Sequence, residues 1–215
     1  MVASEKGFMV LSESDKRHPV KPPPGVSKVM SQSRVKMIPP PVAEPLAVAR
    51  MRPQPRVLLR KEAMESAFRK YGRGFSYIHF ATHGQFDPAM PLKSALLLAG
   101  DEQSDGRFTV DKLYSMNIDA EMVTLSACET GLGKVANGDD VVGLTRDFLY
   151  AGSNSIVSSL WKVDGQATGD LMTGLYNAMK DTGKYQALRQ AQLSTRQKYP
   201  HPYYWASFQL TGNGD

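Results

Sequence analysis

Strand-like and helix-like segments alternate along this chain from residue 57 onward. Apolar, β-branched runs predict strands, and apolar residues three or four positions apart predict helices. We expect strands at residues 75–82, 94–99, 122–127, 155–163 and 205–211, and helices at residues 64–71, 109–116, 141–149, 171–179 and 185–199. This alternation is typical of a mostly parallel α/β sheet with helices on both faces, in which right-handed crossovers bring the carboxyl ends of the strands to one edge.

Proline is concentrated at the start of the chain. Residues 1–56 hold ten of the 14 prolines, including runs of three at residues 22–24 and 39–41. Because proline fixes φ and removes a backbone donor, we expect neither helices nor interior strands there. The sequence therefore predicts a proline-rich, basic linker or disordered leader over residues 1–56 and a folded domain over residues 57–215. A ligand for a proline-binding domain is the less favoured interpretation.

The positive charge of the chain lies in the same leading segment. The net charge is +5, and residues 1–56 hold ten Lys and Arg against four Asp and Glu. The remaining residues hold 16 basic against 17 acidic side chains, so the predicted domain is close to neutral. A folded nucleic-acid-binding domain carries its basic residues on one face of the domain itself. Nucleic acid is therefore not the expected partner.

Cysteine content and hydropathy exclude several further classes. A single cysteine, Cys128, cannot form an internal disulfide or a multi-cysteine zinc site. No apolar run approaches the roughly 18 residues that cross a bilayer, and residues 1–11 lack the apolar core of a signal peptide. Neither a phosphate-binding loop nor a G-x-S-x-G element is present in the sequence. We expect a cytoplasmic protein with no membrane partner, no cofactor and no bound metal.

Three reactive side chains directly follow predicted strands: His83, Cys128 and Asp164. Each alone has an ordinary explanation, because buried cysteines fill cores and an aspartate before a helix is usually its N-cap. Together they indicate catalysis, since a thiol needs a base to become the attacking thiolate and histidine suits that task near neutral pH. Gly84 follows the histidine, and its accessible backbone N–H is suited to a developing oxyanion.

Five segments of the sequence resemble a known family. They are residues 80–84 (FATHG), 125–131 (LSACETG), 138–143 (GDDVVG), 158–164 (SSLWKVD) and 201–205 (HPYYW). In this order they resemble the CHAT domain, the caspase-like peptidase domain of bacteria, which is often attached to tetratricopeptide repeats and is related to separase and gingipain. The resemblance covers about residues 57–212. It implies a caspase-like three-layer αβα sandwich, a catalytic dyad of His83 and Cys128, and an oxyanion hole formed by the backbone amides of Gly84 and Cys128.

The resemblance also bears on substrate binding and on the edge of the sheet. In the caspase-like clan an acidic residue often binds a basic side chain of the substrate, and Asp164 lies near the position of that residue in separase-like members. Asp140 is a second candidate for this substrate-binding role, although a solvated loop that caps the next helix is the favoured interpretation of residues 139–140. CHAT domains usually carry a further strand and helix upstream. Because the proline-rich segment occupies that place, the expected fold leaves open that the N-terminal strand portion is lacking.

These observations predict a cysteine endopeptidase that forms an acyl-enzyme on Cys128 and cleaves protein or peptide substrates after a basic residue. The alternative is a catalytically silent caspase-like module that regulates or binds a partner, for which a tetratricopeptide-repeat protein is the candidate. A protease that stays silent until a partner orders its loops lies between the two. Reactivity of the thiol that depends on His83 separates an active dyad from a silent module.

Overall fold

The computed structural model describes most of the 215 residues. The described residues are 7–12, 40–51, 55–85, 87, 89–126, 128–129, 139–161 and 164–215. The side chains of residues 40–43, 128–129 and 139–143 fall outside this description. Among the described helices, none is both long and apolar enough to cross a membrane.

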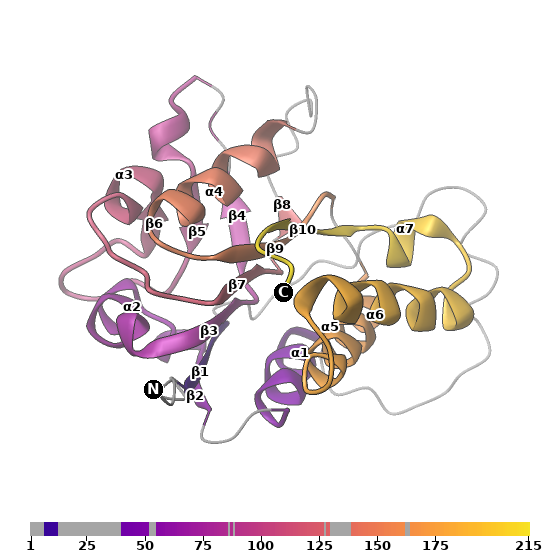
Figure 1. The fold of residues 1–215 in the computed structure, drawn as a ribbon. Coiled ribbons are helices and arrows are strands. Elements are labelled where there is room, and N and C mark those ends of the chain that lie inside the picture. Colours follow the sequence, from indigo (N-terminus) through magenta and orange to yellow (C-terminus); the bar gives the residue numbers. More distant parts are fainter. Residues whose placement is uncertain are drawn as a thin grey trace.

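A six-stranded sheet forms the centre of the described structure, with the strand order β10-β9-β7-β3-β1-β2 (Figure 1). Its strands are β1 (Gly7–Ser12), β2 (Arg56–Leu59), β3 (Phe75–Phe80), β7 (Met122–Leu125), β9 (Ser155–Ser159) and β10 (Phe208–Gly212). Neighbouring strands run parallel except β10, which is antiparallel to β9. The mostly parallel sheet expected from the alternation of segments is therefore confirmed.

A second, four-stranded sheet has the order β6-β5-β4-β8. It comprises β4 (His83–Gln85), β5 (Ala95–Leu97), β6 (Arg107–Thr109) and β8 (Cys128–Glu129). β4 and β5 are antiparallel, as are β5 and β6, whereas β4 and β8 are parallel. β4 follows β3 after two residues and β8 follows β7 after two, so this small sheet lies at the carboxyl edge of the large one.

Helices cover both faces of the large sheet, as Figure 1 shows. α1 (Pro40–Ala49), α5 (Gly165–Ala178) and α6 (Lys184–Lys198) lie on one side, and α2 (Glu65–Tyr71), α3 (Val110–Leu113) and α4 (Asp139–Tyr150) lie on the other. α7 (Pro202–Trp205) and the short 3-10 helices Arg60–Glu62, Gly72–Gly74 and Pro91–Lys93 complete the helical elements of the described residues. The two sides have separate cores, one around Phe68, Phe80 and Phe148 and the other around Leu171, Tyr176 and Leu188.

Two stretches of residues 1–56 belong to this fold, so the prediction of a linker or disordered leader is wrong for them. β1 lies between β2 and β3 and is therefore an interior strand. Phe8 and Val10 join the core beside α1 and α5, whereas Met9 and Leu11 join the opposite core. All four are at most 1% exposed. Burial on both faces stabilises a strand that contains no proline, whatever the composition around it.

The helix α1 is the second stretch for which the linker prediction is wrong. Pro40 and Pro41 lie in its first turn, where the missing N–H would have no partner within the helix. Pro45 lies further inside, and the buried side chains of Glu44 and Val48 offset its cost by packing onto the sheet. The strand and helix that the sequence left open are therefore present, as β1 and α1. The other residues of the leading segment lie outside the described ranges, apart from residues 50–51 and 55–56.

Candidate active site

The two predicted catalytic residues begin neighbouring strands of the small sheet. β3 and β7 are adjacent and parallel in the large sheet, so the segments that follow them emerge at the same edge. The backbone N–H of Ser126 donates to the carbonyl of Phe80, the last residue of β3, at 2.9 Å and continues this pairing one residue beyond β7. His83 is the first residue of β4 and Cys128 is the first residue of β8.

β4 and β8 are paired so that His83 lies opposite Cys128, and Gly84 lies opposite Glu129. Neighbouring strands are about 4.8 Å apart, and residues at matched positions project to the same face. The backbone therefore brings His83 and Cys128 side by side. The Cys128 side chain lies outside the described part of the chain, so the register, rather than a distance between side chains, defines this geometry.

The face of β4 that carries His83 is the face turned away from the core. On the other side of β4, His83 pairs with Leu97 and Gly84 pairs with Leu96. Leu96 is 1% exposed and belongs to the core beside α2, whereas Leu97 is half-buried. Since side chains alternate along a strand, His83 lies on the more accessible face. His83 itself is half-buried.

Asp164 follows β9, the neighbour of β7, and is the N-cap of α5. Its Oδ1 accepts hydrogen bonds from the backbone N–H groups of Gln166 at 2.9 Å and Ala167 at 3.0 Å. Burial, together with the charge of Asp164, raises the pKa of Tyr204. Capping is thus the role that the structure gives Asp164, and its role in substrate binding stays a prediction.

Asp140, the second substrate-binding candidate, is the second residue of α4. It belongs to the helix and not to a loop before it. Its side chain lies outside the described residues, so its contribution to a substrate pocket also stays a prediction.

His79, four residues before His83, is fully buried and does not join the predicted dyad. Its Nδ1 lies 3.1 Å from the hydroxyl of Tyr176 in α5, and its Nε2 lies 3.2 Å from Oε1 of Glu44 in α1. The Tyr176 hydroxyl also lies 2.7 Å from Oγ1 of Thr124 in β7. His79 therefore has a structural role in the core, linking β3 to helices α1 and α5.

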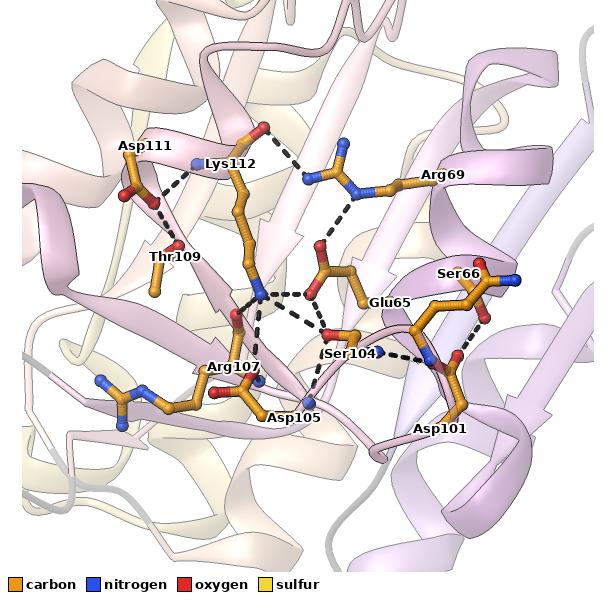
Figure 2. A network of polar contacts seen from close by, with 12 residues as sticks. Glu65, Ser66, Arg69, Asp101, Ser104, Asp105, Arg107, Thr109, Asp111 and Lys112 are labelled. Carbon is orange, nitrogen blue, oxygen red and sulfur yellow. Dashed lines mark hydrogen bonds and ion pairs between the residues drawn. The ribbon is translucent and has the colours of Figure 1, made fainter.

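A polar network joins β6, an edge strand of the small sheet, to helices α2 and α3 (Figure 2). We call Glu65, Arg69, Ser104, Asp105, Arg107 and Lys112 the Glu65 network. Glu65 is 3% exposed and accepts hydrogen bonds from Arg69 Nε at 2.9 Å, from Lys112 Nζ at 2.8 Å and from the Ser104 hydroxyl. Burial raises the pKa of the Glu65 carboxyl, but the hydrogen bonds from Lys112, Ser104 and Arg69 outweigh it and the pKa lies below its usual value.

Lys112 is the other centre of this network. Its ammonium group also donates to the carbonyl oxygen of Arg107 at 2.7 Å and approaches Asp105 Oδ1 at 3.4 Å. Burial lowers the pKa of Lys112, whereas the carboxylates of Glu65 and Asp105 raise it, with a net upward shift. The network thus fastens β6 and the loop before it to α2 and α3. No sequence signal identified it, because its members come together only through the hairpin of β5 and β6.

A model of the CHAT domain family matches residues 2–213. The chain belongs to the CHAT domain family. The match includes β1 and α1, which agrees with their place in the fold.

Curated relatives of this CHAT domain include Tetratricopeptide repeat protein 28 of Mus musculus and of Homo sapiens, each 29% identical over 126 residues. The matched region is 57% of this chain and 5% of each relative, so the chain spans only a small part of the proteins it matches. Both relatives are animal proteins, and the bacterial source implied by the motifs stays a prediction.

Among solved structures, the CHAT domain is similar to the Arg-specific cysteine proteinase gingipain R (RGPB), with a TM-score of 0.52 and 9% identity. The similarity covers 81% of this chain and 42% of that one. At this identity it shows the fold, which is the caspase-like α/β fold predicted from the sequence. A fold alone does not establish an activity, so the chemistry has to be argued from the site itself.

Proposed function

We propose that this CHAT domain is a cysteine endopeptidase that hydrolyses peptide bonds through His83 and Cys128. The observation that carries the proposal is the pairing of these two residues across β4 and β8. A nucleophile and its general base have to lie within hydrogen-bond reach, and matched positions on adjacent strands, with Cβ atoms about 4.5–5.5 Å apart, support such an approach. The caspase-like fold and membership of the CHAT family support the same assignment.

In the proposed reaction, His83 accepts the thiol proton of Cys128 and the thiolate sulfur attacks the substrate carbonyl carbon. A carbon–sulfur bond forms, and the carbonyl π electrons move to the oxygen. The protonated His83 then gives its proton to the leaving amine as the carbon–nitrogen bond breaks. Water, deprotonated by His83, attacks the acyl-enzyme and releases the carboxylic acid and the thiolate. This sequence requires neither a metal nor a cofactor.

Backbone amides would stabilise the negative oxygen of the tetrahedral intermediate. The family resemblance assigns this role to Gly84 and Cys128, which occupy adjacent strands of the small sheet. Each such donor lowers the activation free energy of acyl transfer by on the order of 3 kcal/mol.

Asp164 is the proposed recognition group for a basic residue before the cleaved bond, with Asp140 as the second candidate. A carboxylate has about four lone-pair sites, and helix capping uses only part of that capacity on Oδ1. Asp164 can therefore cap α5 and also accept a Lys or Arg side chain. The name of the structural neighbour, an Arg-specific proteinase, supports a basic substrate residue.

A tetratricopeptide-repeat protein is the proposed partner, because both curated relatives carry that name. This context also favours the second candidate function, a silent caspase-like module that acts only on binding its partner. The cytoplasm remains the expected compartment, since a thiolate nucleophile has to stay reduced to react.

The single cysteine makes the proposal directly testable, because every thiol label reports on Cys128. The rate of iodoacetamide labelling is measured against pH for the folded chain, the urea-unfolded chain and the His83→Ala variant. A thiolate stabilised by His83 gives a labelling midpoint well below the ordinary thiol value of about 8.5, and His83→Ala returns it to that value. Cleavage of a mixture of fluorogenic Lys- and Arg-peptides is followed in parallel, with Cys128→Ala as the inactive reference.

His201→Ala serves as the matched control, because His201 is exposed and caps the short helix α7. Its labelling profile should equal that of the unsubstituted chain. A folded chain that labels with the same midpoint as its His83→Ala variant would overturn the dyad. A lowered midpoint without cleavage, even with a tetratricopeptide-repeat partner added, would exclude the endopeptidase and favour the silent module.

A further inference from the structure

The position of His83 depends on a strand that is too short to define its own register. β4 has three residues and β8 has two. A slip of one residue turns every side chain of a strand to the opposite face, so a slipped β4 would carry His83 away from the face it shares with Cys128. Gly84, in the middle of β4, has no side chain that could oppose such a slip. Side chains around the strand therefore have to hold it in place, and one of them is Thr82, whose hydroxyl donates to the carbonyl oxygen of Leu97 in β5.

Arg107 in β6 supplies a second contact, at the other end of β4. Its Nη1 donates to Oε1 of Gln85, the last residue of β4, and its Nη2 donates to the backbone carbonyl of Lys93 at 3.2 Å. The guanidinium therefore reaches across β5 and joins β6 to both β4 and the 3-10 helix that follows it. Its planar fork with fixed N–H directions makes this contact specific in geometry.

The register shows why this contact depends on the position of β4. His83 pairs with Leu97, and Leu97 pairs with Arg107, so the three lie in one row across the sheet. Gln85 lies two residues after His83 and therefore on the same face. The bond from Arg107 to Gln85 is compatible only with the register in which His83 faces the side of Arg107. In a slipped strand, Gln85 would point to the opposite face.

Arg107 is itself held firmly enough to act as an anchor. Its carbonyl accepts from Lys112 Nζ at 2.7 Å and its N–H donates to Asp105 Oδ1 at 3.0 Å. Lys112 is in turn bound to the buried carboxylate of Glu65, as Figure 2 shows. A continuous chain of contacts thus runs from α2 and α3 through β6 to the strand that begins with His83.

We propose that Arg107 is a positioning residue, whose guanidinium fixes the register of β4 and so keeps His83 opposite Cys128. The inference rests on the proposed function, because it gives Arg107 an effect on the dyad. Arg107 acts through Gln85 and needs no contact with the substrate. It extends the site from two residues to a support that reaches the buried Glu65.

The experiment compares Arg107→Met, Gln85→Leu and the double variant with Lys93→Met as the matched control. Lys93 is adjacent and exposed, and its side chain pairs with Asp111 at 2.6 Å and not with β4. Arg107→Met and Gln85→Leu retain most of the side-chain volume but remove the donor and the acceptor. Two readouts are taken on the full chain: hydrogen exchange of the β4 amides, which needs no active dyad, and the pH profile of Cys128 labelling.

We expect faster exchange of the β4 amides in both single variants, and labelling at pH 6.5 that is about threefold slower, the scale of one cross-strand pair. Cys128 in the double variant should be labelled no more slowly than in either single variant, because the two substitutions remove the same contact. Gln85→Glu, which keeps the acceptor, should preserve both readouts. Lys93→Met should leave both unchanged.

Unchanged exchange in Arg107→Met overturns the role of Arg107 in holding β4, whether or not the dyad is active. Faster exchange together with an unchanged labelling profile, where His83→Ala does shift that profile, also overturns the positioning role and leaves a purely structural contact. A profile that His83→Ala fails to shift overturns the proposed function, and the effect of Arg107 on the dyad is then lost with it. These three results differ from one another in the two readouts.

Discussion

Glu65 is a buried carboxylate that three donors from three parts of the chain keep ionised. It is 3% exposed, and Lys112, Arg69 and Ser104 surround it. Taking such a charge out of water costs several kcal/mol, which well-formed hydrogen bonds and a partner charge offset. Removing the charge alone leaves the Lys112 ammonium with a weaker partner. The charge of Glu65 therefore stabilises the attachment of the loop before β6, which contains Ser104, to α2.

We predict that Glu65→Gln lowers the free energy of unfolding by about 2 kcal/mol at neutral pH. The folded-state pKa of Glu65 lies below its ordinary value of 4.5, so its contribution is present above pH 4.5 and is lost as the pH falls through the folded value. The difference in the free energy of unfolding between the parent chain and Glu65→Gln should therefore become smaller in acid. Urea denaturation from pH 7 to pH 3 measures it.

A control for this prediction is Asp170→Asn, which removes an exposed carboxylate that pairs with Lys198 at 2.6 Å. An exposed pair of this kind contributes about 0–1 kcal/mol, so the control should unfold almost like the parent chain. If Glu65→Gln and Asp170→Asn behave alike at neutral pH, the buried network does not stabilise the fold in the way its geometry indicates.

At the level of single elements, β1 carries the clearest expectation. Phe8 is 1% exposed, and its ring meets that of Tyr176 edge-on, with the ring centroids 5.1 Å apart. We predict that Phe8→Ala destabilises the protein by about 3–5 kcal/mol, because it leaves a cavity between β1 and α5. Urea or thermal denaturation, followed by circular dichroism, measures the loss. Leu193→Ala, at a 43% exposed position of α6, should change stability by no more than about 0.5 kcal/mol.

An unchanged stability of Phe8→Ala would restore the prediction that residues 1–56 form a linker, since a linker residue buries nothing. The same result would remove β1 from the sheet and leave β3 beside β2 or at an edge. The measurement therefore separates the two descriptions of the leading segment with a single substitution.

Strands and helices were predicted correctly where the apolar residues recur regularly over many positions. They were missed where the high proline and charge content of the surrounding segment argued against any regular structure. The strand expected at residues 75–82 is β3, and the helix expected at residues 141–149 lies within α4. β1 was missed because its run of four apolar residues is short and flanked by charged residues, and because burial on both faces produces no alternation. α1 was missed because its prolines lie mainly in the first turn, the one part of a helix that tolerates them.

The candidate site was predictable only in part, for a similar reason. Parallel strands end at one edge, so the sequence could bring His83 and Cys128 to the same region of the sheet. Their pairing across β4 and β8 could not be predicted, because register depends on contacts with other strands. The bond from Arg107 to Gln85 joins residues 22 positions apart through a hairpin, and no local pattern marks it.

At the level of the whole molecule, β1 contributes to both cores, although its residues were predicted to lie in a linker or disordered leader. Alternate residues of β1 enter the core beside α5 and the core beside α2, and β1 pairs with both β2 and β3. Residues before 57 also supply Glu44, which contacts His79 in β3. A domain that began at residue 57 would therefore lose an interior strand and a covering helix together. β3 would keep its pairing with β7 but lose its partner on the side that β1 occupies.

We predict that a chain of residues 57–215 does not fold into the structure of the full chain. Loss of β1 and α1 removes apolar contacts from both cores at once, and marginal stability of about 5–15 kcal/mol does not survive such a loss. The shortened chain should show a flat near-ultraviolet circular dichroism spectrum, bind the dye ANS and aggregate on size exclusion, whereas the full chain should unfold cooperatively. A separate peptide of residues 1–56, added during refolding, should restore the near-ultraviolet signal by supplying the missing strand and helix. Cooperative unfolding of the shortened chain at the midpoint of the full chain would instead mean that β1 and α1 add nothing to a domain already complete at residue 57, and that the large sheet is stable with β3 at its edge.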